Sequence, residues 1–340
     1  MQIELPISKS IANRWLMLQA IHGDELMPVS DSMPDDVQIL HRALCLIALS
    51  PHRLIDVGNC GTAMRFLTAY CTQLEGQTTI LDGVERMRHR PIGQLVDALR
   101  EIGADIEYLG EEGFPPLRIK GCILDKHRIV PINNPLSTQF VSALLLIGAK
   151  VQTDSTSPYI YITQEVIKQY QLSPFSYHLS VEKDWSSAAF WYEYVALYGG
   201  EITLLGLSRD SLQGDKIVAD IFAHLGIHTT YTAEGAVISS SPLHPTPYTL
   251  HHDFSACPDL YPAIALTCER LGVELHATGV ESLPLKESDR LRAVAEHRTD
   301  ADHRMAMALL IAGYEVDDTA CISKSYPNFI EHFHYINSLK

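Results

Sequence analysis

The chain has 340 residues, 46% of them hydrophobic and 20% charged, which is enough for a sizeable core and suggests two domains. Its formal net charge of −15 makes the whole chain a poor nucleic-acid binder. No run of 18 apolar residues occurs, and the start MQIELPISKS lacks the pattern of a secretory signal, so we expect neither a membrane span nor export. Seven cysteines without a CxxC pair predict reduced thiols and a cytoplasmic protein.

One structural module is predicted twice along the chain. In each copy, apolar residues at helical spacing are followed by a glycine that ends the helix, and then by two short strands around a turn. This repetition predicts an α/β protein with two domains built from similar units. A segment rich in proline and histidine, residues 242–252, is predicted to be a surface loop. The two copies are residues 91–102, 104–108 and 117–119, and residues 217–225, 227–231 and 236–239.

Several predicted helices begin with a small polar or charged cluster and continue with apolar residues. A helix N-terminus offers free N–H groups and a partial positive charge, which favour anions. Capping alone would explain Ser, Thr and Asp at such starts, but it does not explain the cations there. We therefore expect these cations to hold phosphate or carboxylate groups. The starts lie at residues 8–10, 61–62, 137–139, 184–187 and 302–304, and the cations are Lys9, Arg14, Arg65 and Arg304.

Twelve short motifs follow one another between residues 8 and 327. They are SKSIANR (8–14), DDV (35–37), GNCGTAMR (58–65), RMRHRPIG (86–93), STQF (137–140), PYI (158–160), VEKD (181–184), LQGD (212–215), PD (258–259), KESDR (286–290), DHRMAM (302–307) and KSYP (324–327). In this order they closely resemble the EPSP synthase family. Any one motif alone would be weak evidence, but the resemblance covers nearly the whole chain.

The resemblance implies a two-domain inside-out α/β fold of the enolpyruvyl transferase type. Each domain would consist of repeated βαβαββ units, with parallel helices inside and sheets outside. Residues 8–181 would form the N-terminal domain, and residues 1–7 with 182–340 the C-terminal domain, with the active site in the cleft between them. Three connections are short, residues 36–61, 138–182 and 290–304, so we expect some units to be trimmed.

The family reaction transfers the enolpyruvyl group of phosphoenolpyruvate to the 5-hydroxyl of shikimate-3-phosphate and releases phosphate, in the pathway to chorismate and the aromatic amino acids. The resemblance implies that these two small molecules are the partners, with no cofactor, no metal, no nucleic acid and no membrane, and that the protein is a monomer.

The resemblance also implies a set of phosphoenolpyruvate-binding residues. Arginine suits this role because its planar fork binds carboxylate or phosphate through two hydrogen bonds. Without the resemblance, surface ion pairs would explain each arginine equally well. The set is Lys9, Gly61, Arg90, Gln139, Arg290, Arg304 and Lys324.

The remaining site residues are assigned in the same way. Asp259 is the candidate base for the 5-hydroxyl, while Lys9 and Glu287 are candidates for moving the methylene proton, in an order that the sequence leaves open. Helix capping and core packing are the alternative explanations for the hydroxyl-bearing residues. The shikimate-3-phosphate set is Lys9, Ser10, Arg14, Ser137, Thr138, Gln139, Thr156, Tyr159, Asp259 and Lys286.

Other interpretations concern a different function or a metal site. A catalytically degenerate relative that keeps only an anion-binding site is suggested by the short connections. The sister class that uses a UDP-sugar would need a cysteine within residues 86–90, where none occurs. Zinc at His244, His251, His252 and Cys257, or at His332 and His334, fits no tetrahedral spacing well, and the pair Asp35–Asp36 is weak evidence for magnesium.

Overall fold

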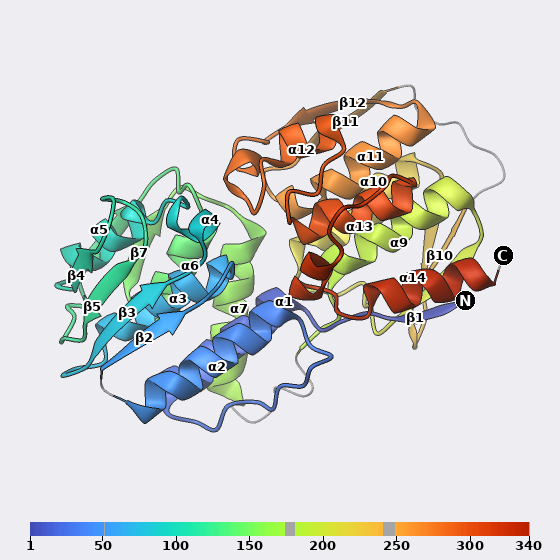
Figure 1. Ribbon diagram of the computed structural model, residues 1–340. Helices are drawn as coiled ribbons and strands as arrows, with labels where there is room; N and C mark the ends of the chain where they lie inside the picture. The colour runs from blue at the N-terminus through green and yellow to red at the C-terminus, as the bar shows by residue number, and fades with distance from the viewer. Residues whose placement is uncertain (51, 174–180, 241–248, 340) are drawn as a thin grey trace. The chain divides into compact units, whose positions relative to one another are not determined.

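The computed structural model describes residues 1–50, 52–173, 181–240 and 249–339 as a mixed α/β protein. The chain divides into two compact units (Figure 1). What we call the C-terminal unit comprises Met1–Ser8, Asp31–Asp35 and Val181–Lys340, and the N-terminal unit comprises Lys9–Ser30 and Asp36–Ser180. Each unit is described by itself below.

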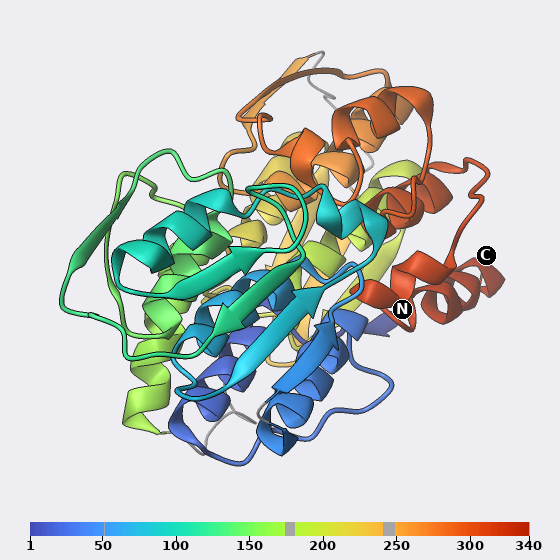
Figure 2. The ribbon, with the colours of Figure 1, turned by 60° about the vertical axis from the view of Figure 1, so that its left-hand side comes forward.

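The N-terminal unit contains a four-stranded sheet in the order β2-β3-β5-β4 and a separate parallel pair, β6-β7. Strands β2 and β3 are parallel and lie side by side in Figure 2, whereas β5 is antiparallel to both of its neighbours. Helix α1 packs on α7, α7 on α6, and α6 on α3. The elements are α1 (Lys9–His22), α2 (Asp35–Leu49), β2 (His52–Asp56), α3 (Gly61–Thr72), β3 (Thr78–Asp82), α4 (Glu85–Arg88), α5 (Gly93–Glu101), β4 (Asp105–Tyr108), β5 (Leu117–Lys120), β6 (Ile129–Ile132), α6 (Thr138–Leu146), β7 (Lys150–Thr153) and α7 (Pro158–Leu172).

The C-terminal unit repeats this arrangement, with a sheet in the order β1-β8-β10-β9 and a parallel pair, β11-β12. Its elements are β1 (Gln2–Glu4), α9 (Trp185–Tyr198), β8 (Glu201–Leu205), η1 (Gly214–Ile217), α10 (Val218–His224), β9 (Ile227–Tyr231), β10 (Gly235–Ser240), β11 (Thr249–Asp253), η2 (Pro258–Leu260), α11 (Tyr261–Leu271), β12 (Glu274–Thr278), η3 (Leu283–Leu285), α12 (Arg290–Glu296), α13 (His303–Ala312), η4 (Ala320–Lys324) and α14 (Phe329–Ser338).

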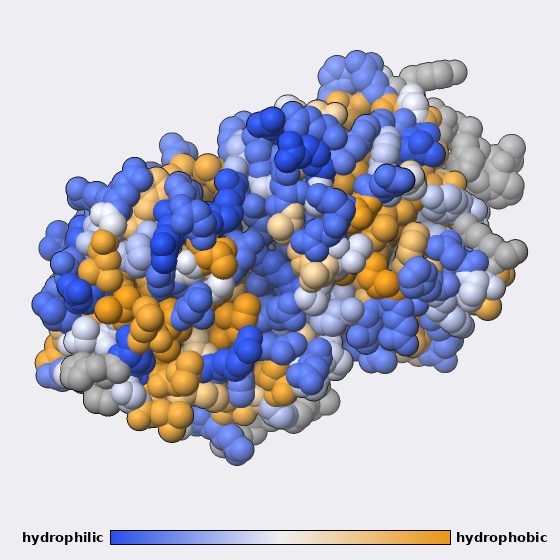
Figure 3. Space-filling model, in the orientation of Figure 1, coloured by the Kyte–Doolittle hydropathy of each residue, from blue (hydrophilic) through white to orange (hydrophobic). Residues whose placement is uncertain are grey.

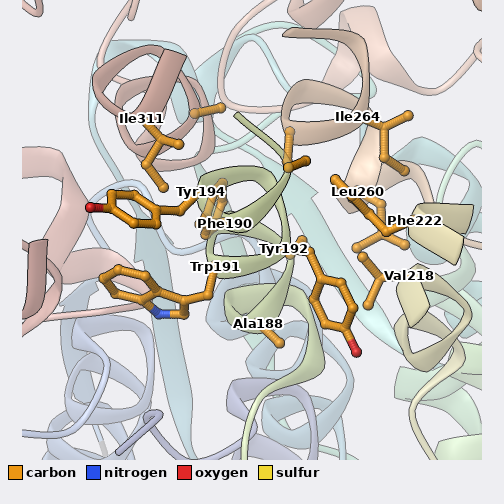
Figure 4. Packing of buried hydrophobic residues seen from close by; sticks show 14 of the residues in the cluster. Ala188, Phe190, Trp191, Tyr192, Tyr194, Val218, Phe222, Leu260, Ile264 and Ile311 are labelled. Carbon is orange, nitrogen blue, oxygen red and sulfur yellow. The ribbon is translucent and has the colours of Figure 1, made fainter. Parts of the chain in front are cut away.

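Helix α9 forms the centre of the C-terminal unit. It packs against α10, α11 and α13, and its large side chains point to opposite sides (Figure 4). Trp191 and Tyr194 lie on one side, while Tyr192 lies near Phe222 of α10 on the other. Asp259 lies in η2, directly before α11, and Arg304 is the second residue of α13. The packing of both helices on α9 therefore helps to position these two predicted site residues.

The predicted repeated module is confirmed in both copies. The first is α5 followed by β4 and β5, and the second is α10 followed by β9 and β10. The predicted loop 242–252 is wrong at its end, because residues 249–252 belong to β11, which pairs with β12 through Leu250 and Leu275. The proline and histidine content hides a short strand that the pairing with β12 reveals. Residues 242–248 lie outside the described residues. No helix in the described ranges is long and apolar enough to cross a membrane.

One core residue of α9 is a carboxylic acid. Glu193 is fully buried, and neither of its carboxyl oxygens has a hydrogen-bond partner among the described residues. Burial raises the pKa of Glu193 well above its ordinary value. The folded protein therefore favours the neutral acid, while the unfolded chain exposes an ordinary glutamate.

The stabilising effect of the protonated Glu193 side chain is complete below the pKa of the unfolded glutamate and is lost as pH rises toward the raised folded pKa. We expect Glu193→Gln to have a higher free energy of unfolding than the wild type at pH 8. The variant should also lack the decrease of that free energy with rising pH, which for one such group is at most about 1.4 kcal/mol per pH unit. Urea unfolding at pH 5 and pH 8, followed through the fluorescence of Trp185 and Trp191, measures this, with the exposed Glu201→Gln as control. An equal difference at both pH values would contradict the prediction.

Candidate active site

Arg290 is the centre of a charged cluster in the C-terminal unit. Its side chain is 1% exposed, and its guanidinium group contacts three carboxylates. Nε lies 2.7 Å from Asp302 Oδ2, Nη1 lies 2.8 Å from Asp259 Oδ1, and Nη2 lies 3.2 Å from Glu287 Oε2. The whole fork of this arginine is therefore engaged by protein carboxylates.

Three further cations share these carboxylates. Arg304 Nη2 lies 2.9 Å from Asp259 Oδ2, and Lys286 Nζ lies 3.3 Å from Asp259 Oδ1. Lys324 Nζ lies 2.9 Å from Glu287 Oε1. Four cations thus share three carboxylates, and the cluster carries a small positive excess of charge. Such an excess suits a site at which the carboxylate of a ligand can replace one from the protein.

Helix starts position most of this cluster, as the sequence predicted. Asp302 caps α13, and its Oδ1 accepts from the Arg304 backbone N–H at 3.0 Å, while its other oxygen holds Arg290. Asp259 lies in η2 just before α11, and Arg290 is the first residue of α12. The sequence places Asp302 at a predicted helix start, but it does not predict the contact with Arg290.

The charges act on one another through a buried environment. Burial would raise the pKa of Asp259, but Arg304, Lys286 and Arg290 together hold that pKa well below its ordinary value. Burial lowers the pKa of Lys286 despite the attraction of Asp259. For Arg290, Asp302 and Asp259 overcome the effect of burial and raise the pKa. Asp259 is therefore ionised at neutral pH, as a general base must be.

Asp215 was missed as a functional candidate, although the motif LQGD was noted. It is buried, accepts a hydrogen bond from Ser186 Oγ, and interacts electrostatically with Asp259 and Arg304. Burial, followed by the charge of Asp259, raises the pKa of Asp215. A second carboxyl group with a raised pKa thus lies close enough to the candidate base to interact with it electrostatically.

In the N-terminal unit, Lys9 is held by an acidic partner. Its Nζ lies 3.0 Å from Asp36 Oδ2, and the two side chains are 14% and 4% exposed. The pair Asp35–Asp36, considered as weak evidence for magnesium, therefore contains the ion-pair partner of Lys9. Asp36 is not among the site residues predicted from the sequence.

The start of α3 brings Gly61 against two arginines. A Cβ atom on Gly61 would lie 2.5 Å from Arg65 Nη1 and 2.7 Å from Arg90 Nη1, so the absence of a side chain allows both guanidinium groups to approach. Arg65 Nη1 donates to Gln139 Oε1 at 2.9 Å, and Gln139 Nε2 donates to Thr62 Oγ1 at 3.0 Å. The starts of α3 and α6 are joined through this amide.

Arg14 faces acceptors from its own unit. Its side chain is buried, and burial lowers its pKa to about 10, so it stays charged at neutral pH. Nε donates to Thr163 Oγ1 at 2.7 Å, and Nη1 donates to the Ser10 carbonyl at 2.7 Å. Nη2 contacts Ser142 Oγ and the Tyr159 carbonyl, at 3.2 and 3.1 Å. Arg14 thereby ties α1 to α6 and α7.

The remaining predicted residues lie at the starts of α6 and α7. Ser137 caps α6 by accepting from the Gln139 N–H at 3.4 Å, and Thr138 is the first residue of that helix. Tyr159 lies in the first turn of α7, and Thr156 is exposed two residues before that helix. Capping thus explains Ser137, whereas the cap of α7 is Ser157, whose Oγ accepts from the Tyr159 N–H at 3.3 Å.

The histidines considered for zinc have other contacts. His252 Nε2 lies 3.2 Å from Cys257 Sγ, His251 stacks on His276, and His332 contacts Tyr326. Across the described residues, no group of three or more His, Cys, Asp or Glu side chains could hold a metal ion. His244 lies outside the described residues.

Comparison with known proteins decides the family. The family model described as EPSP synthase (3-phosphoshikimate 1-carboxyvinyltransferase) matches residues 35–173, 146–297 and 294–333. The chain belongs to the EPSP synthase family. A 3-phosphoshikimate 1-carboxyvinyltransferase of Bacteroides fragilis is 37% identical over 388 aligned positions, which cover 96% of this chain and 93% of that protein. One from Cellvibrio japonicus is 30% identical, covering 99% of this chain and 96% of that protein.

Solved EPSP synthases share the fold. A structure from Acinetobacter baumannii superimposes with a TM-score of 0.70 at 20% identity, covering 98% of this chain and 95% of that one. The alignment with the Bacteroides relative is longer than this chain, so the relative contains insertions where this chain is short. The expectation of a shortened family member is confirmed.

The pairing of Arg290 with Asp302 can be tested against a matched cap. Asp289 caps α12 much as Asp302 caps α13, but Asp289 is only partly buried. Asparagine keeps a capping oxygen at either position and removes the charge. We expect Asp302→Asn to lower the free energy of unfolding by roughly 1.5–3 kcal/mol, because it removes one of the three carboxylates that pair a buried guanidinium.

Asp289→Asn should change that free energy by less than about 0.5 kcal/mol. Urea unfolding of both variants beside the wild type measures the difference. Equal destabilisation by the two substitutions would show that Asp302 acts only as a cap.

Proposed function

We propose that this family member is an active 3-phosphoshikimate 1-carboxyvinyltransferase, which transfers the enolpyruvyl group of phosphoenolpyruvate to the 5-hydroxyl of shikimate-3-phosphate and releases phosphate. The observation that carries this proposal is the intact cluster around Arg290. It joins the candidate base Asp259 and the proton-transfer candidate Glu287 to four cations within hydrogen-bonding distance.

Phosphoenolpyruvate would bind to cations that also contact protein carboxylates. Arg290, Arg304 and Lys324 would exchange contacts with Asp259 and Glu287 for contacts with the substrate carboxylate and phosphate. Hydrogen bonds to charged groups contribute roughly 1.5–3 kcal/mol each, so every clamp matters for affinity. Further binding residues would be Lys9, Gly61, Arg90 and Gln139, of which Gly61 lets Arg90 approach the helix start.

Shikimate-3-phosphate would be bound by groups from the starts of α1, α6 and α7, with Lys286. Because the Arg14 fork is engaged by Thr163, Ser142 and two carbonyl groups, the part of Arg14 in this site is chiefly to fix the three helix starts. The direct contacts would come from Lys9, Ser10, Ser137, Thr138, Gln139, Thr156, Tyr159 and Lys286.

The chemistry follows from the charges. Asp259 takes the proton of the 5-hydroxyl as its oxygen attacks C2 of phosphoenolpyruvate, while Lys9 or Glu287 gives a proton to C3. The tetrahedral adduct then loses phosphate as a proton leaves the new methyl group and restores the double bond. Three cations hold the pKa of Asp259 low in the free protein. When the anionic substrates engage those cations, Asp259 becomes a stronger base.

We further infer that this chain has trimmed repeats, acts as a monomer and works in the cytoplasm with residues of both units. The two-stranded sheets β6-β7 and β11-β12, beside the four-stranded ones, support trimming. So do the exposed apolar side chains of α2 and β2, because a missing element would leave them uncovered. Leu46, Leu49 and Leu54 are 52%, 81% and 65% exposed, and Figure 3 shows apolar surface on this unit. The seven cysteines, none of which forms a CxxC pair, support a reducing compartment.

The test is phosphate release by the purified protein with both substrates. We expect release to require shikimate-3-phosphate and phosphoenolpyruvate together and to fall by roughly 100-fold or more in Asp259→Ala, since a general base contributes at least that much. Asp220→Ala, which removes an exposed carboxylate from α10 of the same unit, is the control. No release, with shikimate-3-phosphate still bound in calorimetry, would instead support a degenerate anion-binding relative.

A further inference from the structure

Residues 31–35, which we call the strap, pack with a unit different from that of their chain neighbours. Residues 9–30 and 36–180 belong to the N-terminal unit, while Asp31–Asp35 group with the C-terminal unit. Within the strap, Pro34 is buried and Asp35 is half-buried. The strap is therefore a structured part of the C-terminal unit and leads directly into α2.

The strap ends on a side-chain hydrogen bond. Ser323 Oγ, in η4, donates to Asp35 Oδ2, and it also lies 3.0 Å from the Ala320 carbonyl. A hydroxyl group has one proton, and a carboxylate is a stronger acceptor than a neutral carbonyl. The contact with Asp35 is therefore the favoured one, although the two residues are 288 positions apart in the chain.

Both partners of this hydrogen bond are adjacent in the chain to supports of site residues. Asp36 follows Asp35 and holds Lys9 at 3.0 Å. Lys324 follows Ser323 and holds Glu287 at 2.9 Å. Consecutive Cα atoms are fixed about 3.8 Å apart, so a displacement of Asp35 or Ser323 is passed to its neighbour.

We propose that Asp35 and Ser323 are positioning residues for the enolpyruvyl transfer, an inference that rests on the proposed function. Their hydrogen bond fixes the supports of Lys9 and Glu287, the two groups assigned to the methylene proton. Its loss lowers turnover more than it weakens substrate binding. Lys9 and Glu287 lose their placement for proton transfer. Of the groups that bind phosphoenolpyruvate, only the two lysines are affected, whereas Arg90, Arg290 and Arg304 keep their placement.

A simpler explanation exists for Asp35 alone. It is the first residue of α2, where a negative charge is favourable for the helix. That explanation gives Ser323 no part, so substitutions of the two residues would act independently. A double-mutant cycle separates the two explanations, because residues that act through one contact have non-additive effects.

The experiment compares the wild type with Asp35→Ala, Ser323→Ala, the double variant and Ser323→Thr, which keeps a hydroxyl group. The values of kcat and KM for phosphoenolpyruvate are measured at saturating shikimate-3-phosphate, and melting temperatures check folding. Ser338→Ala is the matched control, since it removes a serine hydroxyl that donates to the Tyr335 carbonyl in the same unit.

We expect each alanine variant to lose about tenfold in kcat, the loss of one charged hydrogen bond, with KM changed by less than about threefold. The double variant should be no slower than either single one, and Ser323→Thr should recover most of kcat. A kcat within about twofold of the wild type in the single variants would overturn the positioning role but not the proposed function. So would losses of kcat that multiply in the double variant. An inactive wild type would overturn the proposed function and this role together.

Discussion

The buried guanidinium of Arg290 is the constraint on which the site depends. A charge removed from water must be paired, and here three carboxylates pair it at once, from η2, from the loop before α12 and from the cap of α13. A movement of any of these elements would leave the buried charge of Arg290 incompletely paired, which is costly in the low-dielectric interior. The packing of α11 and α13 on α9 supplies the rigid support that keeps the carboxylates in place.

The same pairing explains how a chain with a net charge of −15 can bind two polyanionic substrates. The cations are gathered and held by carboxylates, so they need no ligand to stay assembled. Under the proposed function, a substrate carboxylate or phosphate would replace a protein carboxylate instead of creating a new charge pair. We expect Glu287 to be displaced more readily than Asp302, because Glu287 contacts Arg290 Nη2 and Lys324 Nζ, whereas Asp302 holds Arg290 and also caps α13.

Local patterns in the sequence predicted the modules and the helix starts. Apolar spacing ended by glycine gave α5 and α10 with their strands, and Ser137 and Asp302 cap helices as expected. Partners distant in the chain were not predictable in this way. Arg14 donates to Thr163, 149 positions away, and β11 exists because of its pairing with β12. The ion pair of Lys9 with Asp36 and the electrostatic interaction of Asp215 with Asp259 likewise arise only in the folded chain.

The most direct measurement of the exchange is the affinity of Glu287→Gln for phosphoenolpyruvate. Calorimetry would be done with a shikimate-3-phosphate analogue that lacks the 5-hydroxyl, so that no transfer occurs in the variant or the wild type. If Glu287 occupies cations that the substrate needs, the amide should bind phosphoenolpyruvate at least as tightly as the wild type, although it cannot exchange a proton. A Kd at least about tenfold higher in the variant would contradict this competition and would make Glu287 a direct contributor to binding.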